Sequence, residues 1–364
     1  GGDSSVMRIE PRSKVSKTLI ISVPILSSIA ALLIAAIPIS FAGANILRAY
    51  QEMFLGVFGS IFSFSEMLTR ATPLIFTGLA AALAFRARLW NIGAEGQLYL
   101  GALLSVVVGT GYFDLPPLLL TPIIILCGAM AGAVGMAVPT FLKVRFGADE
   151  VVTTLLLNFV ILIFIQMMLE GALKDPMGLG WPQSSPIVEE AMLPKLIPRM
   201  RVHSGLIVAI VCAVVVHFVL SRTVWGFRVR AVGENATAAR YAGIPVNRSL
   251  FMVAIFSGAL AGLAGVSEVA GLKGYLTADL SPGFGYTGIV VAMLAGLSPI
   301  GVVLAALFIA SVFVGADSMS RAMGVSSYLA DLVVALSLLS VLIGGFVTHF
   351  RVVWSKRPLE KTDD

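Results

Sequence analysis

Long apolar runs recur along almost the whole chain and constrain its fold more than any other feature. A membrane-spanning helix needs about 20 apolar residues, and fewer where it is broken or packed inside protein. Ten runs qualify, at residues 18–40, 70–87, 95–112, 116–140, 150–172, 203–221, 249–271, 285–298, 299–316 and 326–349. They predict an all-α polytopic membrane protein with about ten transmembrane helices in one membrane domain, 18–349.

The composition excludes a soluble globular enzyme. Hydrophobic residues make up 58% of the chain and charged residues 12%, against about 45–50% and about 25% in soluble domains. The net charge of +5 comes from basic residues beside apolar runs, which is typical of membrane proteins and does not indicate nucleic-acid binding. The three histidines lie far apart in the sequence, so we expect no metal site.

The distribution of lysine and arginine predicts the orientation. With ten spans and a cytoplasmic N-terminus, 17 of the 25 basic residues fall on the cytoplasmic side, as the positive-inside rule requires. We therefore expect cytoplasmic tails at 1–17 and 350–364. Residues 1–6, before Met7, resemble a cloning remnant or an upstream start. The first run lacks a clear cleavage site and is expected to be a retained span.

Three connecting segments are longer than turns. Segment 173–202 is rich in proline and is expected on the extracytoplasmic side. Segment 41–69 is amphipathic, so it is either an interfacial element or an ordinary connector. Segment 222–248 carries five arginines, and within it Asn235 is placed to cap a short helix that Gly243 ends. It is either a cytoplasmic docking element or a solvated loop.

The string at 89–102 concentrates polar residues between two apolar runs. It contains Asn91, Glu95 and Gln97, separated by glycines. Polar groups at membrane depth are costly unless they are paired, so they mark either a solute pathway or a buried network. Asn91 and Glu95 are equally suited to bracing a helix start, because a side-chain oxygen there accepts from an unpaired backbone N–H.

Two further strings carry polar or aromatic residues at membrane depth. In the first, Thr154 and Asn158 lie four residues apart on one helix face, where an amide bonds either to a neighbouring helix or to a solute. The second, 283–299, contains Phe284 and Tyr286 among glycines and ends in Ser298-Pro299. That pattern is typical of a broken or re-entrant helix lining a cavity, so 285–316 is either two spans or one interrupted element.

An internal repeat is suggested by the similar glycine-rich, apolar character of 95–112 and 285–316.

No Gly-x-x-x-x-Gly-Lys-Ser/Thr sequence occurs in the chain, so it lacks a P-loop for ATP. No catalytic constellation is visible either. Energy for uphill transport would therefore come from an ion gradient or from another subunit.

The strings 91–97, 151–158, 233–244 and 292–296 together resemble permeases of the ribose and branched-chain amino acid importer superfamily. More narrowly, they are similar to the branch paired with nucleoside-binding lipoproteins. This resemblance implies a bacterial inner-membrane permease subunit of an ATP-binding cassette importer. It also implies a second permease, identical or homologous, and an extracytoplasmic binding protein. ATP and Mg²⁺ would be bound by two cytoplasmic ATPase subunits, with no cofactor in this chain.

Particular residues are expected to carry these roles. The solute pathway would involve Asn91, Glu95, Gln97, Thr154, Asn158, Phe284 and Tyr286. Coupling to the ATPase would involve Gly233, Glu234, Asn235, Ala239, Arg240 and Gly243.

The function predicted from the sequence is nucleoside transport, and three alternatives remain. The same architecture would serve a sugar such as ribose. An ion-coupled transporter would require a buried carboxylate in mid-span, for which Glu95, Glu268 and Asp331 are the candidates. A membrane enzyme would require a catalytic constellation that the sequence lacks.

Overall fold

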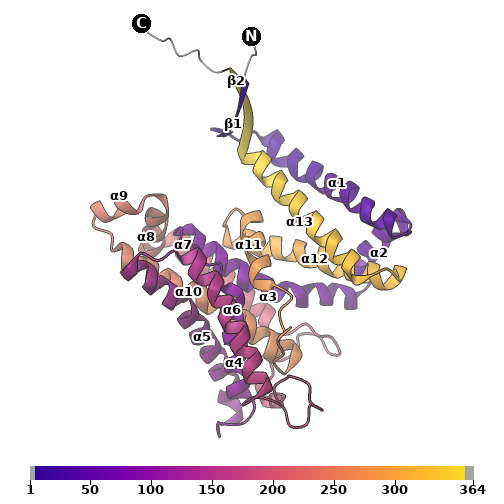
Figure 1. The fold of residues 1–364 in the computed structure, drawn as a ribbon, viewed down its shortest axis with the longest axis vertical. Helices are drawn as coiled ribbons and strands as arrows, with labels where there is room; N and C mark the ends of the chain where they lie inside the picture. Colours follow the sequence, from indigo (N-terminus) through magenta and orange to yellow (C-terminus); the bar gives the residue numbers. More distant parts are fainter. Residues whose placement is uncertain (1–4, 357–364) are drawn as a thin grey trace. The chain divides into compact units, whose positions relative to one another are not determined.

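The computed structural model describes residues 5–356 and is almost entirely helical (Figure 1). The elements are β1 (Ser5–Pro11), α1 (Lys17–Phe41), α2 (Ile46–Phe58), α3 (Ile61–Arg86), α4 (Ala94–Gly109), α5 (Pro117–Phe146), α6 (Glu150–Glu170), η1 (Glu189–Ala191), α7 (Gly205–Arg222), α8 (Val224–Glu234), α9 (Ala236–Tyr241), α10 (Val246–Val266), the π-helix η2 (Ser267–Lys273), α11 (Phe284–Leu294), α12 (Pro299–Met323), α13 (Ser327–His349) and β2 (Phe350–Lys356). Parts of both predicted tails, residues 1–4 and 357–364, lie outside the described residues.

Each of the ten predicted apolar runs coincides with a helix. Within the described residues, eight helices are long and apolar enough to span a membrane, and α4 and α11 are shorter apolar helices. The predicted all-α polytopic membrane fold is therefore confirmed. The internal repeat stays a prediction.

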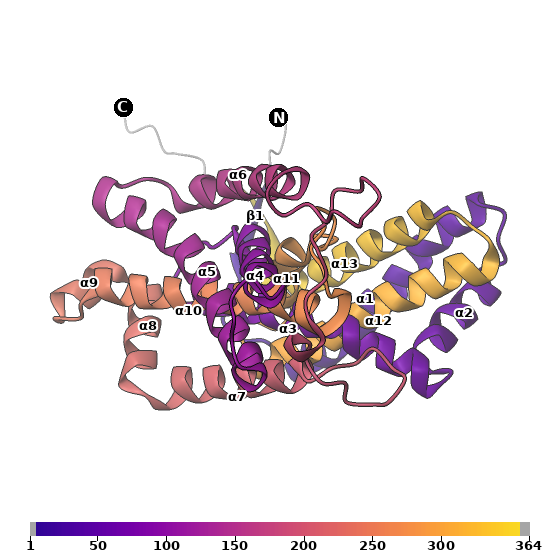
Figure 2. The ribbon, with the colours of Figure 1, turned by 90° about the horizontal axis from the view of Figure 1, so that it is seen from below.

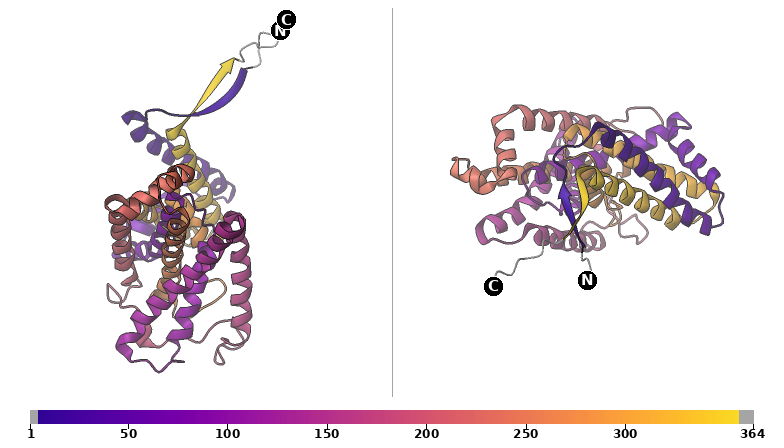
Figure 3. Two further views of the ribbon diagram at one scale, coloured as in Figure 1. Left: turned by 90° about the vertical axis from the view of Figure 1, so that its left-hand side faces the viewer. Right: turned by 90° about the horizontal axis from the view of Figure 1, so that it is seen from above.

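The chain divides into two compact units, which are described separately. The smaller unit consists of Gly1–Glu52 and Met319–Asp364. Within it, α1 and α13 lie side by side, and Gly344 of α13 lies so close to Ser27 that a side chain would not fit. Strands β1 and β2 pair antiparallel, with Met7 opposite Trp354 (Figure 3). The two terminal strands are thus held together at the same end of the α1–α13 pair.

The larger unit, Met53–Ser318, is built around α3. Every residue of α3 from Ala71 to Phe85 is buried, because α7, α10 and α11 all pack against it. A helix that is apolar on all sides and enclosed by other helices is shielded from lipid as well as from water. Helices α4, α5 and α6 also belong to the unit (Figure 2), as do α8, α9, η2 and most of α12.

Small residues allow α5 and α10 to pack closely. Gly128 and Gly132 of α5 face Gly258 and Gly262 of α10, with backbone so near that no side chain would fit between them. Close backbone approach increases van der Waals contact, which is a main source of helix association in membranes. The two Gly-x-x-x-Gly spacings in the sequence therefore form one interface.

The structure corrects one predicted helix start and decides between the alternatives for two other segments. The second run was expected to begin at 70, but α3 begins at Ile61, where the Ser60 hydroxyl accepts from the Ser63 N–H. Part of segment 41–69 forms α2. Residues 285–316 form two helices, α11 and α12, because Gly296 and Leu297 adopt positive φ angles just before Pro299.

Candidate functional site

The loop joining α3 to α4, residues 87–93, is held by the amide of Asn91. Its Oδ1 accepts from the Gly93 N–H at 3.0 Å, next to the start of α4. Its Nδ2 donates to Gln97 Oε1 at 2.9 Å and to Ser257 Oγ on α10 at 3.0 Å. Gln97 Nε2 donates back to Asn91 Oδ1 at 3.0 Å. Asn91 is fully buried, so the network compensates for removing these amides from water.

The amide of Asn158 fastens the same loop to α6. Its Nδ2 donates to the Ile92 carbonyl at 2.9 Å, and its Oδ1 accepts from the Gly96 N–H at 2.9 Å. One turn earlier, the Thr154 hydroxyl accepts from the Ile92 N–H at 3.2 Å. The side chains of Thr154 and Asn158 therefore share one helix face, as their spacing predicts, and that face is turned toward 87–93.

Glu95 connects α4 to the start of α11. Its carboxylate accepts from the Gly285 N–H at 2.8 Å and from the Ser281 hydroxyl at 3.0 Å. Ser281 Oγ in turn accepts from the Phe284 N–H at 2.9 Å. Helix N-termini present unpaired N–H groups and a partial positive charge, so a carboxylate there is stabilised. Gly285 permits this contact, since a side chain would overlap the backbone of Ala94 and Glu95.

These contacts define the polar junction, the set of buried hydrogen-bonded groups joining 87–93, α4, α6, α10 and α11. Of the seven residues predicted for a solute pathway, five form it directly, namely Asn91, Glu95, Gln97, Thr154 and Asn158. Phe284 is buried beside it, while Tyr286 is 39% exposed and its hydroxyl accepts from Asn158 Nδ2 at 3.1 Å. The structure thus assigns bracing contacts to the buried five, and only Tyr286 also offers an exposed surface.

A second cluster, which the sequence analysis missed, surrounds Arg70. Its guanidinium lies 5.4 Å from the Phe313 ring centroid and 5.9 Å from that of Phe284. Asp317 of α12 approaches to 3.6 Å. The buried Nε of Arg70 has no hydrogen-bond partner among the described residues. The predicted run begins at residue 70, which would place this arginine at the end of a span. It is in fact the tenth residue of α3, about 14 Å along the helix.

The predicted coupling segment forms a pair of helices, α8 and α9, after the end of α7 (Figure 2). Asn235 caps α9 as expected, since its Oδ1 accepts from the Ala238 N–H at 3.0 Å. Gly243 ends the helix with a φ of +86° and open space around it. Gly233 and Ala239 are buried, whereas Glu234, Asn235, Arg240 and Gly243 are exposed.

The predicted extracytoplasmic segment 173–202 is folded over the ends of α4 and η2. The Ile187 N–H donates to the Gly274 carbonyl, the Val188 N–H to Gly109 and the Leu193 N–H to Ala270, each at 2.8 Å. Arg201 forms an ion pair with Glu66 of α3. The segment is therefore a structured cap on this end of the larger unit.

His203 lies at the edge of this cap and is only 1% exposed. Its Nδ1 accepts from the Gly205 N–H at 3.1 Å, while Nε2 is buried without a partner among the described residues. Burial lowers the pKa of His203 to about 4, and the positive charge of Lys195 acts in the same direction. The imidazole is therefore neutral at physiological pH.

Comparison with known proteins places these features in a family. Residues 63–342 match the family described as branched-chain amino acid transport system / permease component. The glucose ABC transporter permease protein TsgB13 of Haloferax volcanii is 36% identical over 95% of this chain and 93% of its own length. The guanosine ABC transporter permease protein NupP of Bacillus subtilis is 36% identical over 88% of this chain and 92% of its own length. The nucleoside ABC transporter permease protein NupB of Lactococcus lactis is 32% identical over 84% of this chain and 86% of its own length.

The helices, their lengths and the buried polar junction define a multi-pass membrane protein. The chain belongs to the branched-chain amino acid transport system / permease component family, whose match covers most of its length. The predicted membership of an ABC-importer permease family is confirmed.

Proposed function

We propose that this chain forms, with a second permease subunit, the pathway by which an ATP-driven importer moves nucleosides across a bacterial inner membrane. The single observation that carries the pathway is Arg70, the tenth residue of the apolar helix α3, which pairs with Asp317 of α12. Its side chain is 32% exposed and that of its partner Asp317 is 41% exposed. Charged groups on a membrane-spanning helix are unstable against lipid. We infer that their exposed atoms face a water-filled pathway or a companion subunit.

The surroundings of Arg70 suit a nucleoside. A neutral solute with a flat aromatic base stacks on aromatic rings and on a guanidinium plane, and the half-buried Phe313 lies beside this arginine. Tyr286, two residues after Phe284, adds an exposed hydroxyl-bearing ring. The names of NupP and NupB, which refer to guanosine and nucleosides, support the same solute class.

Energy for transport would come from partner subunits. The sequence has no P-loop, so we expect ATP and Mg²⁺ to be bound by cytoplasmic ATPase subunits docked on α8 and α9. The exposed residues Glu234, Asn235 and Arg240 are available for that contact. An extracytoplasmic binding protein would deliver solute to the side capped by 173–202. ATP binding would then favour one facing of the pathway through its differential affinity for the two states.

The orientation proposed from lysine and arginine agrees with the terminal strands. Because β1 and β2 pair, both ends of the described chain must lie on the same side of the membrane. The excess of basic residues near these ends supports the cytoplasmic side.

The experiment is ATP-dependent uptake by the intact complex in proteoliposomes. We expect labelled guanosine or uridine to accumulate, with ATPase subunits co-purifying. Replacing Arg70 by glutamine should lower uptake about tenfold, as expected for losing roughly 1–2 kcal/mol of stacking and hydrogen bonding. Arg321, an exposed arginine in the last turn of α12, provides a matched control. Equal uptake by Arg70→Gln and Arg321→Gln would contradict the pathway assignment.

A sugar is the second candidate solute, because the glucose permease protein TsgB13 matches 95% of this chain. The same proteoliposomes should be offered labelled glucose and ribose. Uptake of either sugar without nucleoside uptake would replace the proposed solute and keep the proposed architecture. Solute transport by the purified chain without any ATPase would overturn the importer itself.

A further inference from the structure

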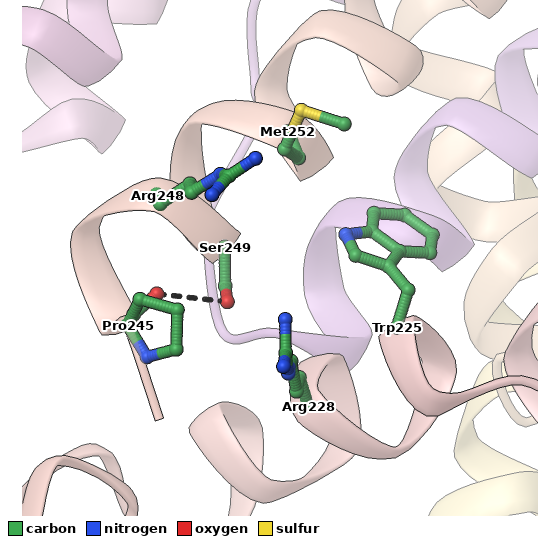
Figure 4. Close-up of a pocket in the computed structure, with 6 residues that line it drawn as sticks. All are labelled: Trp225, Arg228, Pro245, Arg248, Ser249 and Met252. Atoms are coloured by element: carbon green, nitrogen blue, oxygen red, sulfur yellow. Dashed lines mark hydrogen bonds between the residues drawn. The ribbon is translucent and has the colours of Figure 1, made fainter. Parts of the chain in front are cut away.

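Two adjoining hollows lie at the end of the larger unit where α7 ends and α10 begins. The smaller, of about 120 Å³, is lined by Trp225, Arg228, Arg248 and Met252, together with Pro245 and Ser249. In Figure 4 the two arginines and the indole ring surround one space, with the arginines coming from α8 and α10. The larger hollow, of about 520 Å³, shares Trp225 and Met252 with the first.

The smaller hollow is cationic and lacks a counter-charge. Both arginines are exposed, and among the described residues neither guanidinium group has an acidic partner or a hydrogen bond. The indole Nε1 of Trp225 is buried, and it too has no hydrogen-bond partner in that part of the chain. Buried polar groups are normally paired, so the buried indole N–H calls for an acceptor that the described residues do not supply. Together with the two exposed guanidinium groups that line the same space, it indicates an anionic ligand with several acceptor oxygens.

The larger hollow is apolar and opens along the membrane-spanning helices α7 and α10. Val211, Val215 and Val219 line it from α7, and Phe256 and Leu260 line it from α10. These side chains offer no hydrogen bond to a polar solute. In a bilayer, a groove of this kind is filled by hydrocarbon, because lipid is the local solvent.

We propose that the two hollows together bind one anionic phospholipid. The phosphate would lie between Arg228 and Arg248, and an acyl chain would follow the groove between α7 and α10. The indole of Trp225 lies where the two hollows meet, and its ring centroid is 5.7 Å from that of Phe256. That matches the preference of tryptophan for the boundary between headgroups and hydrocarbon. Basic hollows beside apolar helix surfaces are suited to such lipids.

The site is separate from the polar junction and from Arg70, so it stands independently of the transported solute. A docked ATPase subunit is the competing occupant for the arginines, since α8 also belongs to the proposed coupling segment. The continuous apolar groove favours lipid, because a cytoplasmic protein would leave that groove empty.

The test uses quenching of tryptophan fluorescence by brominated acyl chains. The full chain is placed in phosphatidylcholine vesicles containing increasing amounts of dibromo-phosphatidylglycerol, or of dibromo-phosphatidylcholine with the same acyl chains. Two arginines that hold one phosphate, at about fivefold each, predict a preference of about 25-fold for the anionic lipid. The stronger quenching by the anionic lipid should vanish in Trp225→Phe, which would show that Trp225 is the tryptophan being quenched. The same preference should weaken at high ionic strength.

Matched variants separate this site from general surface charge. The double variant Arg228→Gln/Arg248→Gln should reduce the preference to about onefold. Arg145→Gln/Arg222→Gln removes the same charge from exposed arginines at the ends of α5 and α7, and should keep most of the preference. Equal effects of the two double variants, or equal quenching by both lipids in the unchanged chain, would overturn the proposal.

Two further outcomes test the occupant. Ala259→Leu adds a side chain to the apolar groove and should weaken quenching by both lipids at least several-fold. Unchanged quenching in that variant would overturn the assignment of one lipid to both hollows. If Arg228→Gln/Arg248→Gln loses co-purifying ATPase while the unchanged chain shows no lipid preference, the arginines are a protein contact and the lipid site is wrong.

Discussion

Single side chains in the polar junction stabilise the break between α3 and α4. The loop 87–93 has backbone groups that no helix can pair, and the side chains of Asn91, Thr154 and Asn158 pair with several of them. Inside a bilayer an unpaired backbone group is costly, so irregular backbone is tolerated only where protein shelters it. Substituting any of these three residues is therefore expected to lower the stability of the fold.

Replacing Asn158 by leucine should destabilise the protein. The change leaves the Ile92 carbonyl and the Gly96 N–H without their partner, at about 1–3 kcal/mol for each buried group. The thermal unfolding midpoint of the purified chain should fall clearly. Tyr286→Phe is the control, because it removes only the hydroxyl that Asn158 contacts and should leave stability nearly unchanged. Unaltered stability with lost uptake in Asn158→Leu would instead assign the amide to solute.

His203 should make stability depend on pH. Its folded pKa of about 4 is below the ordinary value of 6.5, so the unfolded chain binds more protons between these pH values. Stability is then full above pH 6.5 and declines as the pH falls toward about 4, by at most about 3 kcal/mol. His203→Asn keeps an acceptor for the Gly205 N–H without titrating there. Chemical denaturation between pH 7 and 4.5 should show a smaller decline for this variant, and parallel curves would exclude His203 as the cause.

At the scale of elements, short helices and their ends position the surfaces available to partners. Helix α9 has only six residues, too few to be stable alone. It is defined by its Asn235 cap and by Gly243 at its end. A substitution at this end therefore changes the surface of α9 without disturbing the larger unit.

Gly243→Trp should weaken ATPase docking. The position has open space around it but a positive φ, so any side chain adds backbone strain of about 1 kcal/mol. Gly243→Ala carries the same strain without the bulk and serves as the matched control. We expect ATPase co-purification to fall at least several-fold more for tryptophan than for alanine. Equal recovery with both variants would remove α9 from the docking surface.

At the scale of the whole molecule, β1 pairs with β2, so the two ends of the described residues lie side by side. We predict from this pairing that both ends share one side of the membrane. The number of helices alone does not establish that both ends share one side. An even number of spans would be needed, and α4 and α11 are too short to be counted as full spans by length. The strand pairing is therefore an independent constraint on topology.

Cysteine labelling tests that topology. In a background lacking Cys127 and Cys212, Met7→Cys and Arg351→Cys should react alike with a membrane-impermeant reagent, and only after the cytoplasmic side is opened. Trp181→Cys, at an exposed position in the cap, should react in intact cells. Different labelling of Met7→Cys and Arg351→Cys would contradict the pairing of β1 with β2 in the membrane.

The sequence by itself determined the class, the approximate places of the apolar helices, the break before Pro299 and the cap at Asn235. All of these depend on local chemistry, namely runs of apolar residues, proline and side chains that bond to nearby backbone. The sequence left open whether 285–316 forms two helices, and it placed the start of α3 at residue 70 instead of Ile61. It did not determine that Asn158 and Glu95 bond to backbone outside their own helices, or that Arg70 lies beside Phe284 and Phe313. Those partners lie far apart along the chain, so only tertiary packing brings them into contact and decides which polar groups are paired and which remain exposed.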